Sequence, residues 1–187
     1  MTWFKNIWRY VVLALVTAFA VHLASVALIP RAIMIVALHK MSSLHGYNTM
    51  THSPRATSAS RAVVRPSPDL LYSACPFDLD QAGGMLHVHT EGMPNTYWSV
   101  SIFDAQTDNI FALNDRDAHG GGIDFILKRS NTPPLRDKTK LALETPTPRG
   151  LILIRTLIDD DRHLAAIDAA RRHAACEPYT APRWNPR

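Results

Sequence analysis

The feature that most constrains this chain is a run without formally charged residues from Val11 to Ile29. As an α-helix it would extend about 28 Å, at about 1.5 Å per residue, which is close to the hydrocarbon thickness of a bilayer. A helix satisfies its backbone hydrogen bonds internally, so such a run is stable in lipid. The sequence therefore predicts one transmembrane helix, and the remaining residues must work next to a membrane.

The charges on either side of this run suggest its orientation. Lys5, Arg9 and the amino terminus are positive on one side, and Arg31 and Lys40 are positive on the other. Cytoplasmic flanks carry an excess of positive residues, and the slight bias here favours a cytoplasmic N-terminus. The rest of the chain is then expected outside the cytoplasm.

A cleaved signal peptide is the alternative to a retained anchor, since Ser25-Val26-Ala27 resembles a cleavage site. The apolar run is longer than a usual signal core, and a second apolar run, Ala32 to Leu38, follows Pro30. We therefore expect residues 1–45 to form an anchor and stalk helix, with Pro30 near the first turn of its second part.

The composition of the remaining chain favours one β domain. About 140 residues follow the anchor, enough for a single core. Twelve of the thirteen prolines lie in this part, among mostly short apolar runs, which is typical of a loop-rich β domain rather than a helical bundle. The formal net charge is +4, and no basic stripe alternates with aromatic residues, so nucleic-acid binding is not expected.

The hydrophobic pattern predicts a linker over 46–68, a domain over 69–176 and a loose tail over 177–187. The strands expected in the domain, the first of them interrupted at Pro76, are Leu70–Leu79, Met85–Thr90, Tyr97–Asp104, Asn109–Asn114, Ile123–Lys128, Lys140–Leu143 and Gly150–Ile158. A helix should follow the Asp159–Asp161 run, which offers an N-cap. The predicted fold is mainly β: an antiparallel sandwich or jelly-roll-like domain with one C-terminal helix.

Two segments carry a family resemblance. The first runs from Arg61 to Ser73 and continues at Phe77-Asp78-Leu79; the second runs from Tyr97 to Asp104, with Asn109 after it. Together they resemble the bacterial family catalogued as domain of unknown function 1254, in particular its short members with a single membrane anchor. The resemblance extends from the anchor to about Cys176. It implies a β-sandwich-like fold and brings no established catalytic residues.

The resemblance also suggests a function. Longer members carry a second, related β domain after this one, so the resemblance implies a protein partner that supplies the sibling domain in trans. We expect an uncharacterised, non-catalytic binding or assembly module, anchored once in the bacterial inner membrane with its β domain in the periplasm. The alternative is a small-ligand-binding or metal-dependent enzyme.

That alternative would use residues near the rigid Pro66-Ser67-Pro68 segment. The candidate ligand-binding residues are Arg65, Asp69, Tyr72 and Tyr97. Asp69 pairs with Arg65 or caps a turn in this hypothesis, and Tyr72 binds a ligand hydroxyl. The structural alternative is an ordered strand entry whose polar groups satisfy buried backbone.

A metal site is the second chemical hypothesis. His87 and His89 share one face of a predicted strand, and Glu91 and His119 could contribute further ligands. Zinc or copper would suit such a site, and no other cofactor is expected. The competing interpretation is a solvated strand face.

Cys75 and Cys176 are the only cysteines. In an oxidising compartment they can form one disulfide; two buried free thiols are the alternative. We find no C-x-x-C, G-x-S-x-G, H-E-x-x-H or phosphate-binding glycine motif, so the sequence does not identify a reaction.

Overall fold

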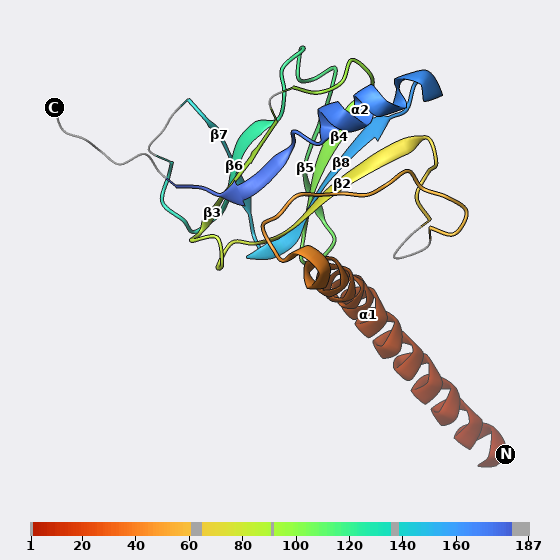
Figure 1. Cartoon of the computed structure of the whole chain (residues 1–187). Helices are drawn as coiled ribbons and strands as arrows, with labels where there is room; N and C mark the ends of the chain where they lie inside the picture. Colours follow the sequence, from red (N-terminus) through yellow and green to blue (C-terminus); the bar gives the residue numbers. More distant parts are fainter. Residues whose placement is uncertain (1, 61–64, 91, 136–138, 181–187) are drawn as a thin grey trace.

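The computed structural model describes residues 2–60, 65–90, 92–135 and 139–180. The first element, α1 (Thr2–His45), is one continuous helix that projects from the rest of the molecule (Figure 1). Over Ile7–His45 it is long and apolar enough to cross a membrane. Pro30 lies inside this helix rather than near the first turn of a second one. The proline ring fixes a φ that an α-helix can adopt, although it removes one hydrogen bond and crowds the carbonyl of the residue four positions earlier.

The first sheet contains five antiparallel strands, ordered β1-β2-β8-β4-β5. Their bounds are Thr51–His52 (β1), Leu70–Asp78 (β2), Trp98–Asp104 (β4), Asn109–Asn114 (β5) and Arg149–Leu157 (β8). The most apolar predicted strand, β8, is central, and its residues alternate between buried and half-buried. β1 lies inside the range predicted as a linker.

The predicted interruption at Pro76 is wrong, because β2 continues through this residue, which pairs with Leu151. The carbonyl of Pro76 accepts a hydrogen bond from Asn48 N, on the side of β2 away from β8. The N and O of one residue point the same way in an antiparallel ladder. The missing N–H therefore faces the side of β2 where β1 pairs only with Ser73 and Ala74 and does not reach Pro76, so no ladder hydrogen bond is lost.

The second sheet contains four strands, ordered β7-β6-β3-β9. Their bounds are Met85–His89 (β3), Asp124–Arg129 (β6), Leu141–Thr145 (β7) and Ala175–Pro178 (β9). The expected antiparallel pairing is wrong for one pair, since β6 and β7 run parallel, with Phe125 opposite Leu141 and Arg129 opposite Thr145. β9 crosses the predicted domain end at Cys176, because backbone pairing with β3 orders Glu177 and Pro178.

The core lies between the two sheets, which together give the predicted sandwich-like, mainly β architecture (Figure 1). The first sheet contributes buried side chains such as Phe77, Val100 and Ile152, and the second contributes Leu86 and Phe125. The predicted disulfide between Cys75 and Cys176 is present and connects β2 to β9, hence one sheet to the other.

The C-terminal helix is a short 3-10 turn, η1 (Asp161–His163), followed by α2 (Leu164–Arg171). Asp160 caps η1, accepting from Arg162 N over 2.8 Å, as expected of the aspartate run. Ile167 of α2 is buried with Leu71 and Ile158, so the helix extends the core past the end of the first sheet.

Candidate functional site

The predicted ligand-binding residues lie near one end of the first sheet. The backbone oxygens of Asp69 and Tyr97 flank the end of β8, accepting from Ile158 N over 2.9 Å and Leu157 N over 2.8 Å. The hydroxyl of Tyr72 accepts from Ser67 N over 3.0 Å. That hydroxyl therefore holds the proline-flanked segment, which agrees with the structural alternative for Tyr72. Arg65 and Asp69 are exposed.

The best-connected side chain at this end is the buried Arg171 of α2. Its guanidinium donates to Tyr72 O over 2.9 Å, to Ser73 Oγ over 3.1 Å and to Ser53 O over 2.7 Å, and it forms an ion pair with Asp168. Burial lowers the pKa of Arg171, against the opposing effect of Asp168. This arginine connects the helix to β2 and to the segment after β1.

His52 of β1 is coupled to the same group. Its Nδ1 lies 2.8 Å from the buried Ser73 Oγ, which already accepts from Arg171. The direction of this hydrogen bond depends on the imidazole tautomer, because a hydroxyl that accepts from Arg171 keeps one donor and one further acceptor position. Burial, followed by the charges of Arg171 and Arg172, lowers the pKa of His52. The serine–histidine pair resembles an activated nucleophile in its contact, but Ser73 is buried and held by arginine, which is a structural role.

Two pockets lie in the described part of the chain. One, of about 420 Å³, is between α2 and the segment after β1 and is lined by Pro54, Arg55, Leu71, Asp161, Arg162, Leu164, Ala165, Asp168 and Arg172. The other, of about 570 Å³, lies beside the glycine-rich loop and is lined by Thr90, Gly92, Met93, Pro94, Asn95, Thr96, Tyr97, Trp98, Asp115, Gly120, Gly121 and Gly122. Of the four predicted ligand-binding residues, Tyr97 alone lines either of these two pockets.

The histidine pair lies elsewhere, on the second sheet. His87 and His89 of β3 have stacked rings, with centroids 4.4 Å apart. His87 Nε2 lies 2.9 Å from Asp124 Oδ1, and His89 Nε2 lies 3.3 Å from Glu177 Oε1. The carboxylates beside the pair are thus Asp124 of β6 and Glu177 of β9. Glu91 lies outside the described residues, and His119 lies in the loop 115–122, beside the pocket of Tyr97.

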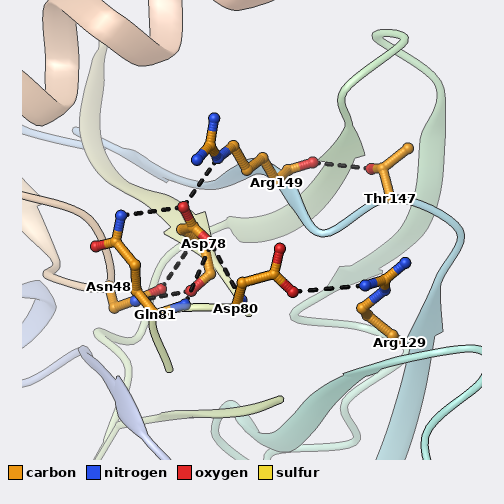
Figure 2. A network of polar contacts seen from close by, with 7 residues as sticks. All are labelled: Asn48, Asp78, Asp80, Gln81, Arg129, Thr147 and Arg149. Atoms are coloured by element: carbon orange, nitrogen blue, oxygen red, sulfur yellow. Dashed lines mark hydrogen bonds and ion pairs between the residues drawn. The ribbon is translucent and has the colours of Figure 1, made fainter. Parts of the chain in front are cut away.

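A second polar network, drawn in Figure 2, connects α1 to the sandwich. Asn48 and Asp78 form a reciprocal pair: Asn48 Nδ2 donates to Asp78 O, and Asp78 N donates to Asn48 Oδ1, each over 2.9 Å. The buried carboxylate of Asp78 accepts from the backbone N of Asp80 and Gln81 and from Arg149 Nε over 2.8 Å. The chain leaving α1 is thereby bonded to the end of β2.

The C-terminal part of α1 also contacts the domain directly. Met34, Ala37 and Leu38 are buried, whereas large apolar residues nearer the N-terminus, such as Leu23, are exposed. Arg31 Nη2 donates to Gln106 Oε1 in the β4–β5 turn over 2.7 Å. The helix therefore changes environment near Arg31, from an exposed apolar rod to a part packed against the sandwich.

The comparison with protein families agrees with these boundaries. The model of a family described as a protein of unknown function, DUF1254, matches residues 47–178, more than half of the chain. The chain belongs to this family. The matched region begins just after α1 and ends at the last residue of β9, so it contains both sheets of the DUF1254 domain.

Two solved structures resemble this DUF1254 chain. The crystal structure of the VPA0106 protein from Vibrio parahaemolyticus has a TM-score of 0.60 and 14% identity, covering 89% of this chain and 43% of that one. A crystal structure of an uncharacterized protein from Burkholderia cenocepacia has a TM-score of 0.46 and 16% identity, covering 81% and 41%. This chain spans less than half the length of either. No curated protein matches the sequence.

Three residues of the segments that carry the family resemblance make contacts within the domain. Tyr72 and Ser73 are contacted by Arg171, and Asp78 organises the junction with α1. The sequence analysis did not identify Arg171 as a contact of these residues, and it placed Glu177 in the loose tail over 177–187. No local signal identifies either partner, because both contacts join residues about a hundred positions apart.

Proposed function

We propose that this DUF1254 protein is a membrane-anchored, non-catalytic assembly module whose β domain docks on a partner domain outside the cytoplasm. The observation that carries the proposal is the partial coverage of the Vibrio protein: 89% of this chain corresponds to 43% of that chain. That relative therefore has further chain beyond the shared fold. We infer that the β domain of this chain docks on a domain of the sibling type.

The contacts between α1 and the sandwich support an assembly role at the membrane. Arg31 bonds the β4–β5 turn, Leu38 is buried, and the Asn48–Asp78 pair holds the chain after α1. These contacts, made both by the helix and by the chain that follows it, limit rotation of the domain about the end of α1. A domain fixed in this way presents the same surface at a constant height above the bilayer, which reduces the orientational entropy lost on docking.

The disulfide supports a location outside the cytoplasm, since thiols in the bacterial cytoplasm are kept reduced. Together with the slight positive bias before Val11, it favours a cytoplasmic N-terminus and a periplasmic domain at the inner membrane. Protease treatment of spheroplasts tests this orientation. We expect the β domain to be digested from outside; protection of the domain would overturn the periplasmic assignment.

Photo-crosslinking in cells tests the partner. A photoreactive amino acid replaces Leu141, an exposed apolar residue of the domain, and Leu23 of the membrane helix serves as the matched control. We expect position 141 to capture a protein that contains a sibling β domain, identified by mass spectrometry, and position 23 not to capture it. A detergent-extracted particle with the mass of one chain and no such adduct would overturn the proposal.

A further inference from the structure

The outer face of the second sheet gathers two histidines and two carboxylates from three neighbouring strands. β3 lies between β6 and β9, and its register places His87 opposite Glu177 and His89 opposite Asp124. The contacts run along the diagonals, from His87 to Asp124 and from His89 to Glu177. Because β3 alternates, Leu86 and Val88 are buried in the core while both imidazoles point outward.

The donor atoms are already close enough for one ion. One ligand atom from each of His87, His89 and Glu177 lies within 4.8 Å of the other two. Ligands held about 2.0–2.1 Å from a tetrahedral zinc ion are about 3.3 Å from one another. His89 Nε2 and Glu177 Oε1 are 3.3 Å apart, which fits two ligands of one ion and is long for a hydrogen bond.

A neighbouring carboxylate completes the arrangement. Asp124 Oδ1 accepts from His87 Nε2 over 2.9 Å, and Lys140 binds the other oxygen of Asp124. These two contacts hold Asp124 in place beside His87. An imidazole that donates from Nε2 to a carboxylate presents its Nδ1 lone pair, as in many zinc sites.

We propose that His87, His89 and Glu177 bind one Zn²⁺ ion on the outer face of the second sheet, with Asp124 as a positioning residue for His87. Two imidazoles and one carboxylate form a ligand set that zinc uses where a fourth position stays open. The side chain of Glu177 is 60% exposed, so this open position faces solvent and admits water or a ligand from a partner. Mg²⁺ prefers oxygen ligands and should not compete.

Equilibrium dialysis of the detergent-solubilised full chain against Zn²⁺, with elemental analysis of the retained protein, tests the site. We expect one bound ion per chain and no effect of excess Mg²⁺. His87→Ala and His89→Ala should each weaken binding by more than about tenfold, since even the loss of a positioning partner costs about 10–100-fold. Glu177→Gln should weaken binding as well, and Asp124→Asn should do so to a smaller extent.

The matched control is His119→Asn, which removes an exposed histidine outside the cluster and suits its positive φ of 48°. This variant should bind Zn²⁺ as the parent does. Thermal unfolding without metal shows whether each variant is folded, and His89→Gln provides a second, polar replacement. Zn²⁺ bound equally by parent, H87A and H89A, or no stoichiometric binding by the parent, would overturn the proposal.

Discussion

The guanidinium of Arg171 donates through Nη1 to the backbone oxygen of Tyr72 over 2.9 Å, although the two residues are 99 positions apart. This bond connects α2 to β2, which contains Tyr72 and Ser73 at the end of the first segment of family resemblance. The same side chain is buried and also contacts Ser73 and Ser53. The end of the first sheet therefore depends on one cation supplied by α2.

Replacing Arg171 with Met should lower the free energy of unfolding by about 1–3 kcal/mol, because the charged hydrogen bonds to Tyr72 O and Ser73 Oγ are lost. Urea denaturation in detergent, followed by near-ultraviolet circular dichroism, measures the change. Arg172→Met is the matched control: this neighbour also binds Asp168, but its side chain is half exposed, so its loss should cost less than about 1 kcal/mol. Equal effects of the two substitutions would contradict the assigned role.

Asn48 combines two hydrogen bonds to Asp78 with a backbone φ of 59°. Asn48→Ala loses both bonds and places an unsuitable residue in the left-handed region, whereas Asn48→Gly loses the bonds but keeps the conformation. We expect Asn48→Ala to cost about 2–3 kcal/mol and Asn48→Gly about 1 kcal/mol less. Thermal denaturation of both variants separates the two contributions; a Gly variant less stable than the Ala variant would refute this account.

Gly150 lies where β8 passes between β2 and β4. A Cβ atom there would meet Phe103 O at 2.2 Å and Phe77 Cζ at 2.5 Å, so no side chain fits without backbone movement. Gly150→Ala should destabilise the domain by about 3 kcal/mol, at the upper end of ordinary overpacking effects. Gly92→Ala is the control, since a Cβ there meets nothing within 4 Å and its φ is not positive. Comparable urea midpoints for the two variants would show that β8 is more loosely placed.

The disulfide between Cys75 and Cys176 closes a separation of 101 residues across the two sheets. In the chain-entropy model a loop of this length stabilises the folded state by about 4–5 kcal/mol. Replacing both cysteines with Ala should therefore lower the urea midpoint strongly, and reduction of the parent should do the same. A parent protein whose cysteines react with an alkylating reagent in its folded, unreduced state would contradict the pairing.

The lowered pKa of His52 predicts a pH-dependent stability. Its ordinary value is 6.5, and in the folded state burial and then the charges of Arg171 and Arg172 lower it, opposed by Asp168. The unfolded state then binds more protons as the pH falls below 6.5, so stability present at neutral pH is lost through the folded-state pKa. His52→Gln should reduce this acid-side loss.

Urea midpoints recorded between about pH 5 and pH 8 measure this effect. The exposed His119, replaced by Asn, should leave the pH dependence as it is in the parent. An identical acid-side slope for the parent and the His52→Gln variant would show that another group is responsible.

Local pattern was sufficient for most of the β elements. The alternation from Trp98 to Asp104 and from Met85 to His89 predicts strands at those residues, and the Asp159–Asp161 run predicts a capped helix start. These features depend on neighbours in sequence, so the residues themselves carry the information. The same alternation places His87 and His89 together on one face of their strand, opposite the buried Leu86 and Val88.

Contacts between distant segments were not accessible in this way. Pro76 remains in β2 because β1 pairs only with Ser73 and Ala74 and does not extend beside it. The parallel pairing of β7 with β6 likewise joins segments that are not adjacent in sequence. The third residue of the histidine cluster is Glu177, because β9 pairs with β3. Each depends on which segments become neighbours after folding.

The sequence by itself determined a long apolar helix near the N-terminus and most strand positions, because charge, hydropathy and period two act over a few residues. Only the tertiary structure decided which residues those elements contact. Arg171 binds the backbone of Tyr72, Asn48 binds Asp78, and two carboxylates lie beside the histidine pair of β3. These meetings arise from the pairing of strands far apart in the chain, and no local pattern encodes a partner.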